Sequence, residues 1–134
     1  MIDWATEYPQ IQDWSAKRGV DPLFIAAIRH AENGGPGKEL GILAVHAPTY
    51  QDQVRVATRT IAGLLAGYPA NPYSAILVEV AGMKRLVYAA AFLRTVQQHW
   101  APIGATNDPQ NSNSNWLGNV TDAYTAFVAI GEPR

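Results

Sequence analysis

The stretch at residues 22–32, PLFIAAIRHAE, constrains the fold of this chain more than any other. Asp21 followed by Pro22 is the pattern of an N-cap and a first-turn proline, so a helix is predicted to begin there. The residues from Leu23 to Ile28 are apolar on nearly every side of that helix. A short helix that is apolar all round has to be buried, so the rest of the chain must supply elements that surround it.

Helical periodicity predicts most of those surrounding elements. The predicted helices cover residues 9–19 with Pro9 in the first turn, 49–67, 83–100 and 116–130. Trp100 is expected in the core, and the predicted inward stripe of the last helix comprises Trp116, Val120, Ala123 and Phe127. The apolar run at 74–82 fits either a helix or a strand, and we favour a helix because helices flank it. Leu40 and Ile42 can share one face of a strand, so a small β-hairpin is possible near residues 38–46.

The predicted fold class is therefore mostly α, with at most that small hairpin. A chain of 134 residues is long enough for one domain with a real core, and we expect residues 1–134 to form a single domain. The composition, 48% hydrophobic and 16% charged, is not that of a disordered chain.

Charge and composition exclude several classes of function. A formal net charge of −1 gives no electrostatic drive towards nucleic acid, so no nucleic-acid partner is expected. The absence of cysteine excludes disulfides and thiol chemistry. The start of the chain lacks the pattern of a signal peptide, and no apolar run is long enough for membrane insertion.

One carboxyl group stands out at the end of the apolar helix. Glu32 is followed by the helix breakers Gly34, Gly35, Pro36 and Gly37. The partial negative charge of a helix C-terminus and partial burial both raise the pKa of a carboxyl group. A carboxylic acid that keeps its proton near neutral pH can act as the general acid in glycosidic-bond cleavage. The alternative is a solvated Glu that precedes an ordinary C-cap.

Three segments of the chain, AAIRHAENGG, GILAV with APTY, and WAPIGATNDPQNSNSNWLGNV, resemble the lysozyme-like superfamily. The likeness is greatest to soluble lytic transglycosylase domains and to phage muralytic enzymes (endolysins), and it covers roughly residues 22–124. The resemblance implies an α+β lysozyme-like fold with Glu32 as the catalytic acid. It also implies that Gly41, Ile42 and Leu43 form a second motif across the substrate cleft, and that Asn107, Asn115 and Trp116 form a third. These residues, together with His30, would bind the substrate.

The chain departs from the family pattern at two places. Ala44 stands where the second motif usually ends in Gln, and no Tyr-Asn-Ala-Gly motif is present, although Tyr88 occupies roughly its place. Hydrolysis and formation of a 1,6-anhydro product therefore both stay open. The spacing His-x-Glu-x-Gly-Gly, which starts at His30, is also similar to the catalytic helix of family 19-type chitinases.

Further candidate residues lie outside these motifs. Glu39 follows Glu32 across the glycine turn, and as a second carboxylate it could act as base or hold water, or it could be a surface charge beside Lys38. Tyr88 and Tyr124 combine an aromatic face with a polar tip, and one of them is expected near the acid. The histidines share no metal-ligand spacing, so neither a metal nor another cofactor is expected.

The function that follows from the resemblance is cleavage of the β-1,4 bond between N-acetylmuramic acid and N-acetylglucosamine in peptidoglycan. The partner would be the glycan strand, and the protein would be a monomer. It would be made in a host cytoplasm and act on the bacterial cell wall after release or as part of a virion. The alternatives are a non-catalytic lysozyme-like module, either a virion structural protein or a wall-binding one, and a chitinase-like hydrolase.

Overall fold

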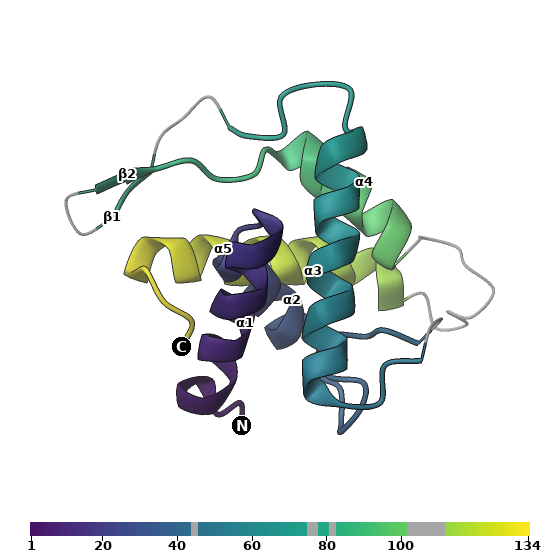
Figure 1. The fold of residues 1–134 in the computed structure, drawn as a ribbon. Helices are drawn as coiled ribbons and strands as arrows, with labels where there is room; N and C mark the ends of the chain where they lie inside the picture. The colour runs from purple at the N-terminus through teal and green to yellow at the C-terminus, as the bar shows by residue number, and fades with distance from the viewer. Residues whose placement is uncertain (44–45, 75–77, 81–82, 102–111) are drawn as a thin grey trace.

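The computed structural model describes residues 1–43, 46–74, 78–80, 83–101 and 112–134. The protein is mostly helical, as the sequence predicts (Figure 1). No helix among these residues is long and apolar enough to cross a membrane. The elements follow in the order α1 (Trp4–Arg18), α2 (Pro22–Glu32), α3 (Tyr50–Gly67), β1 (Val78–Val80), β2 (Met83–Arg85), α4 (Ala90–Trp100), the 3₁₀ helix η1 (Ser112–Asn115) and α5 (Trp116–Ile130).

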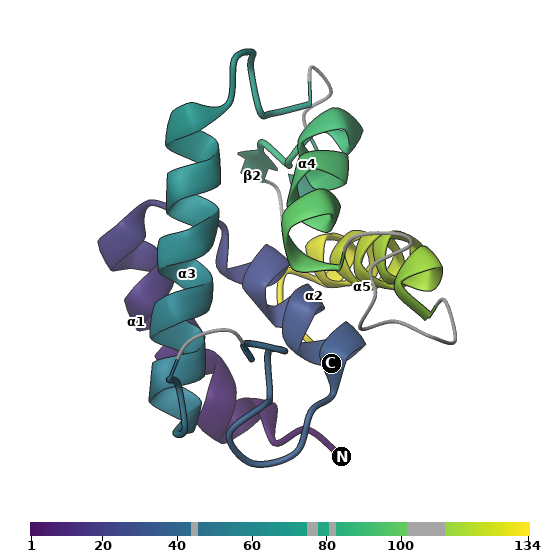
Figure 2. The same cartoon turned by 90° about the vertical axis from the view of Figure 1, so that its right-hand side faces the viewer.

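Helix α2 lies at the centre of the molecule, between α1 and α3 on one side and α5 on the other (Figure 2). The five residues from Phe24 to Ile28 have no exposed surface. Asp21 caps the first turn by accepting a hydrogen bond from the amide of Leu23 at 3.0 Å. The predicted buried helix is therefore confirmed with its predicted bounds.

Helix α1 begins earlier than predicted. Its N-cap is Asp3, whose side chain accepts a hydrogen bond from the amide of Thr6, and Pro9 lies inside the helix rather than in its first turn. The ring of Trp4 packs edge-on against Phe127 of α5, with 5.8 Å between centroids. This tertiary contact holds the extra turn in place, although Pro9 removes one backbone donor from the helix.

The prediction of helices over 74–82 and 83–89 is wrong wherever these residues are described. Strands β1 and β2 pair antiparallel, with Val78 opposite Arg85 and Val80 opposite Met83. The pairing continues beyond the strands, since the amide of Ser74 bonds to the carbonyl of Val87 at 2.7 Å. Short apolar runs rich in valine fit either structure, and here pairing between the two segments outweighs local periodicity.

The possible hairpin near 38–46 is not found in the described part of that range. Backbone groups of residues 37–47 bond instead to the side chain of Gln53 on α3. Its Oε1 accepts from the amides of Leu40 and Ile42, and its Nε2 donates to the carbonyls of Gly37, Ile42 and Ala47, all at 2.8–3.2 Å. One buried amide thus replaces the second strand as the partner of this backbone.

Helices α3 and α5 confirm the sequence prediction closely. Thr49 caps α3 by accepting from the amide of Asp52 at 3.1 Å. The inward stripe predicted for α5 is buried, and it comprises Trp116, Val120, Ala123 and Phe127. Trp100, expected in the core, is half-buried, and its indole N–H donates to the carbonyl of Leu40 at 3.0 Å.

Candidate active site

Glu32 is the last residue of the central helix. The helix ends because Asn33 adopts the left-handed conformation, with φ of 44°, and its amide bonds to the carbonyl of Arg29 at 3.0 Å. A left-handed residue after the last turn is a common way to end a helix, and Asn tolerates it better than most residues. The carboxyl group of Glu32 is consequently held at the end of the most buried element of the protein.

Two residues contact the carboxyl group of Glu32, one nearby in the sequence and one distant. The indole N–H of Trp116, at the start of α5, donates to Oε1 at 2.7 Å. The backbone of Gly41 passes directly over the carboxyl, where φ is +73° and a Cβ atom would lie 2.6 Å from Oε2. Gly41 is therefore required both for its backbone conformation and for the space that a side chain would fill.

The pKa of Glu32 is raised above its ordinary value of 4.5. Burial is the larger cause, because it disfavours the charged carboxylate, and the hydrogen bond from Trp116 opposes it by stabilising the charge. The direction matches the one predicted from the position of Glu32 at a helix end. The groups seen against the carboxyl, however, are Trp116 of α5 and the backbone of Gly41, which lie outside α2.

The turn after Glu32 folds back tightly on itself. A Cβ atom on Gly34 would lie 1.8 Å from the carbonyl oxygen of Lys38, so only glycine allows this approach. Gly35, in contrast, has nothing within 4 Å of its Cβ position. The glycine at position 34 is therefore a packing requirement, which lets the chain turn back towards Glu32 before residue 41.

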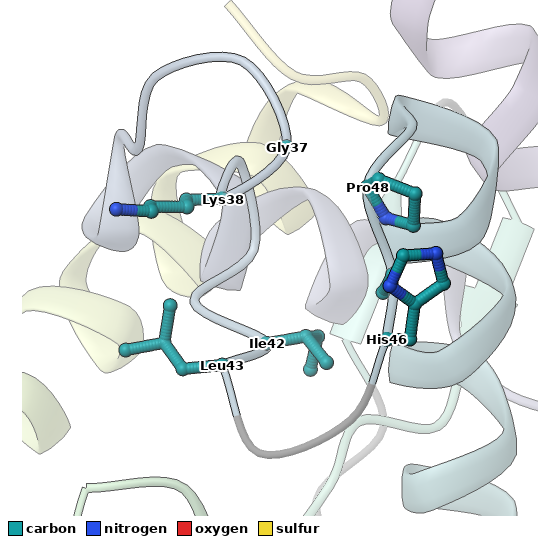
Figure 3. A pocket seen from close by; sticks show the side chains of 7 residues that line it. Gly37, Lys38, Ile42, Leu43, His46 and Pro48 are labelled. Atoms are coloured by element: carbon teal, nitrogen blue, oxygen red, sulfur yellow. The ribbon is translucent and has the colours of Figure 1, made fainter.

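Two surface hollows are lined by residues next to this site in the chain, since Ala31 precedes Glu32 and Ile42 follows Gly41. One, of about 430 Å³, adjoins Gly41 and is lined by Lys38, Ile42, Leu43 and the residues 46–48 that precede α3. In Figure 3 the Ile42 side chain points towards His46 and Pro48, whereas Lys38 and Leu43 extend away from them. The other hollow, of about 320 Å³, is lined by His30 and Ala31 of α2 and by residues of α5.

Glu39 lies in a different environment from Glu32. Its side chain is 8% exposed, and it lines a third hollow together with Glu7, Arg29 and Tyr50. Arg29 forms a two-pronged ion pair with Glu7 of α1, with Nε and Oε1 2.6 Å apart. This places Glu39 against the interface of α1 and α3, and the surface-charge alternative for it is wrong.

The structure does not bring Tyr88 or Tyr124 to the acid, which corrects that expectation. The hydroxyl of Tyr124 donates to Asp21 at 2.6 Å, and the hydroxyl of Tyr88 accepts from the amide of Asp21 at 2.9 Å. Asp21 caps the opposite end of α2, roughly 15 Å from Glu32 at 1.5 Å per residue. Asp21 also pairs with Arg85 of β2, so these groups join the hairpin to the helix start.

The remaining predicted residues fall into four groups. Gly41 and Trp116 contact Glu32, while Ile42, Leu43 and His30 line the two hollows. Asn115 is exposed at the end of η1 and directly precedes Trp116. Asn107 lies outside the described residues.

Sequence reasoning missed Gln53, which orders the segment over the acid. The sequence pattern that could have identified it is a glutamine in line with the apolar face of a helix. Gln53, Ala57 and Ile61 repeat at a spacing of four along α3, and all three are buried. A buried amide at such a position must find several hydrogen-bond partners, and a neighbouring irregular segment can supply them.

No group of three or more His, Cys, Asp or Glu residues within the described ranges could hold a metal ion. Comparisons with protein-family models, curated proteins and solved structures find no match to this chain.

Proposed function

We propose that this protein cleaves the glycan strands of peptidoglycan and that Glu32 is the general acid. The observation that carries the proposal is the setting of the Glu32 carboxyl group. The group is half-buried at the end of a buried helix, and its pKa is raised. Residue 41, which lies against Oε2, is a glycine and therefore covers that oxygen with no side chain. Such a group keeps its proton to higher pH than an exposed Glu and can deliver it to a bound oxygen.

The proposed reaction begins with transfer of that proton. The O–H bond of Glu32 breaks as the proton moves to the bridging glycosidic oxygen, and the electron pair of the C1–O bond leaves with that oxygen. The sugar ring becomes oxocarbenium-like at C1. Either water or the 6-hydroxyl of the same sugar then attacks C1, and the proton lost by the attacking oxygen returns to the Glu32 carboxylate. Water gives a hydrolysed chain end, whereas the 6-hydroxyl gives a 1,6-anhydro end.

The surroundings of Glu32 favour the 6-hydroxyl as the attacking group. Burial and Trp116 are the causes of the pKa shift at Glu32, and no second carboxylate among the described residues contributes to it. Glu39 lines the hollow beside Arg29 and Tyr50 instead. An inverting hydrolase needs a carboxylate about 6.5–9.5 Å from its acid, on the opposite face of the sugar. An internal hydroxyl needs no such partner.

The class of substrate rests on the family resemblance and on two hollows lined by residues next to the site. One hollow is lined by Ala31, beside Glu32, and the other by Ile42, beside Gly41, so a polymer would have more than one place to contact the protein near the acid. A lysozyme-like fold is part of the proposal, because a buried helix that ends in Glu and is covered by a Gly-Ile-Leu segment is what the resemblance implies. Action on the cell wall after release from a host cell, or from a virion, follows from the same resemblance.

Digestion of purified peptidoglycan tests the proposal most directly. We expect soluble muropeptides whose masses show 1,6-anhydro-muramic ends, and we expect none from the Glu32→Gln variant. Ordinary reducing ends would assign the attack to water. Cleavage of chitin oligosaccharides in preference to peptidoglycan would favour the chitinase-like alternative. Binding to cell walls without any product would contradict catalysis and favour a non-catalytic module.

A further inference from the structure

The hydrogen bond between Trp116 and Glu32 joins an indole N–H, which keeps its proton at all ordinary pH values, to a carboxyl group, which can gain or lose one. An indole N–H only donates hydrogen bonds, so Oε1 of Glu32, 2.7 Å from Nε1, has to accept in both protonation states of the carboxyl group. A neutral carboxylic acid has one carbonyl oxygen, which accepts, and one hydroxyl oxygen, which carries the proton. The proton of neutral Glu32 therefore belongs on Oε2.

Oε2 is also the oxygen closer to Gly41. A Cβ atom on residue 41 would lie 2.6 Å from Oε2 and 3.1 Å from Oε1. Gly41 opens the segment whose next two residues, Ile42 and Leu43, line the larger hollow beside the acid. The oxygen that carries the proton thus faces the segment that adjoins this hollow, while the other oxygen faces α5.

Trp116 itself offers little surface to a ligand. Its side chain is 7% exposed and belongs to the hydrophobic core. An aromatic residue that stacks on sugars has to present a ring face to solvent, which a core residue does not do. The buried ring therefore fits a role in holding the Glu32 carboxyl group better than the substrate-binding role that the resemblance implies for Trp116.

We propose that Trp116 is a positioning residue, which reserves Oε1 as an acceptor and so assigns the transferable proton of Glu32 to Oε2, on the side of Gly41. The use of that proton on a glycosidic oxygen rests on the proposed function. The location of the proton is a property of the free protein and is tested without substrate.

Other charged and titratable groups lie on α2 and on the elements packed against it. On its own helix, Arg29 is paired with Glu7 of α1, and His30 packs edge-on against Phe127. Asp122 of α5 lines the hollow beside His30, and Glu39 lines the hollow beside Tyr50.

Two further charged groups lie on neighbouring described segments. Asp52 at the start of α3 pairs with Arg55, and Lys38 lines the larger hollow. None of these groups is among the causes of the Glu32 shift, so Trp116 is the polar partner to perturb.

The first test uses the wild-type protein and nuclear magnetic resonance of its four tryptophan indole N–H groups. The Trp116 indole, assigned by its loss in Trp116→Phe or by its contacts to α5, should shift with pH along a curve whose midpoint lies above the ordinary pKa of Glu. The same curve should vanish in Glu32→Gln, because the amide does not titrate. A Trp116 indole signal that stays constant through this range in the wild-type protein would overturn the proposal.

The second test compares Trp116→Phe with the matched control Trp14→Phe, whose indole ring lies beside Lys17 on α1. The Glu32 carboxyl pKa is followed by carbon-13 resonance in each protein. Loss of the Trp116 donor should raise this pKa by about one unit, the scale of a hydrogen bond to a charged group. The control should leave it within about 0.3 of a unit, well below that scale. Equal shifts in both variants would overturn the proposal.

These readouts separate the inference from the proposed function. A titrating Trp116 indole in a protein that releases no muropeptides would leave the proton assignment standing and remove its catalytic use. Lysis by a protein whose Trp116 indole does not titrate would leave Glu32 as the acid and remove Trp116 as its positioning residue.

Discussion

Gly41 and the carboxyl group of Glu32 are packed so closely that no side chain fits between them. A Cβ atom at position 41 would lie 2.6–3.1 Å from the three nearest carboxyl atoms, and the backbone there has a φ of +73°. The residue that follows the acid by nine positions thus sets how close the polypeptide comes to it. This relationship gives the first prediction.

Gly41→Ala should abolish lytic activity and lower the free energy of unfolding by about 1–3 kcal/mol, from backbone strain and the clash with Glu32. Activity on purified cell walls and urea unfolding measure the two effects. Gly35→Ala is the matched control in the same turn, because its Cβ position is open. Full activity of Gly41→Ala would show that the close approach is not needed for catalysis.

Glu32→Gln should remove lytic activity, because the amide is nearly isosteric but delivers no proton. Glu39→Gln makes the same chemical change at a carboxyl group that lines another hollow, and it should keep activity within about tenfold of wild type, short of the scale of general acid–base help. Initial rates of muropeptide release compare the two variants. A loss of about a hundredfold or more in Glu39→Gln would restore Glu39 as a base.

The pH dependence of activity should show a falling alkaline limb that belongs to Glu32. Its pKa is raised, so the protonated acid persists above pH 4.5, and activity should fall as pH rises through the raised value. Turnover at saturating substrate and fixed ionic strength measures this limb. A flat profile through about pH 9, where an ordinary Glu is fully ionised, in a protein that stays folded by circular dichroism, would contradict the assignment of Glu32 as the acid.

The same raised pKa predicts a cost in stability. Between the pKa of Glu32 in the unfolded chain and its raised pKa in the folded protein, the native state keeps a proton that the unfolded chain has released. The contribution of Glu32 to the free energy of unfolding therefore falls as pH rises through this range. Glu32→Gln should therefore be more stable than wild type at neutral pH, and the difference should disappear below the ordinary pKa. Urea unfolding at both pH values measures it. An equal difference at both would attribute the effect to packing.

Gln53→Ala should disorder the segment over the acid. Five hydrogen bonds join this side chain to backbone groups of residues 37–47, and its removal leaves several of those groups unpaired. We expect a loss of about 2–4 kcal/mol in unfolding free energy and of most of the activity. Gln51→Ala, an exposed neighbour on α3, should change neither quantity. A stable, active Gln53→Ala would mean that other contacts hold the segment.

The sequence predicts the helices of this protein well where the apolar period and the caps agree. The bounds of α2 are correct because Asp21, Pro22 and the glycines after Glu32 mark both of its ends. The errors fall where tertiary contacts decide the local structure. Trp4 packs on Phe127, and this contact extends α1. Strand β1 pairs with β2 where the sequence predicts a helix.

The candidate site shows the same division. Glu32 and Gly41 can be found from the sequence, because a lone carboxyl group before glycines and a Gly-Ile-Leu motif are local patterns. The positions of Glu39, Tyr88 and Tyr124 could not be predicted from the sequence, because they depend on how α1, α5 and the hairpin pack around α2. Gln53 was missed because its partners are backbone groups, which leave no pattern in the side-chain sequence.

The hydrogen bond between Glu32 and Trp116 spans 84 positions of the chain, and this separation bears on when the surroundings of the carboxyl group are completed. During synthesis the N-terminal part emerges first, so Glu32 leaves the ribosome well before Trp116. The hydrogen bond to Oε1 therefore forms only after residue 116 has been made and α5 has docked against α2. A nascent or truncated chain that stops before residue 116 would carry Glu32 without its indole partner.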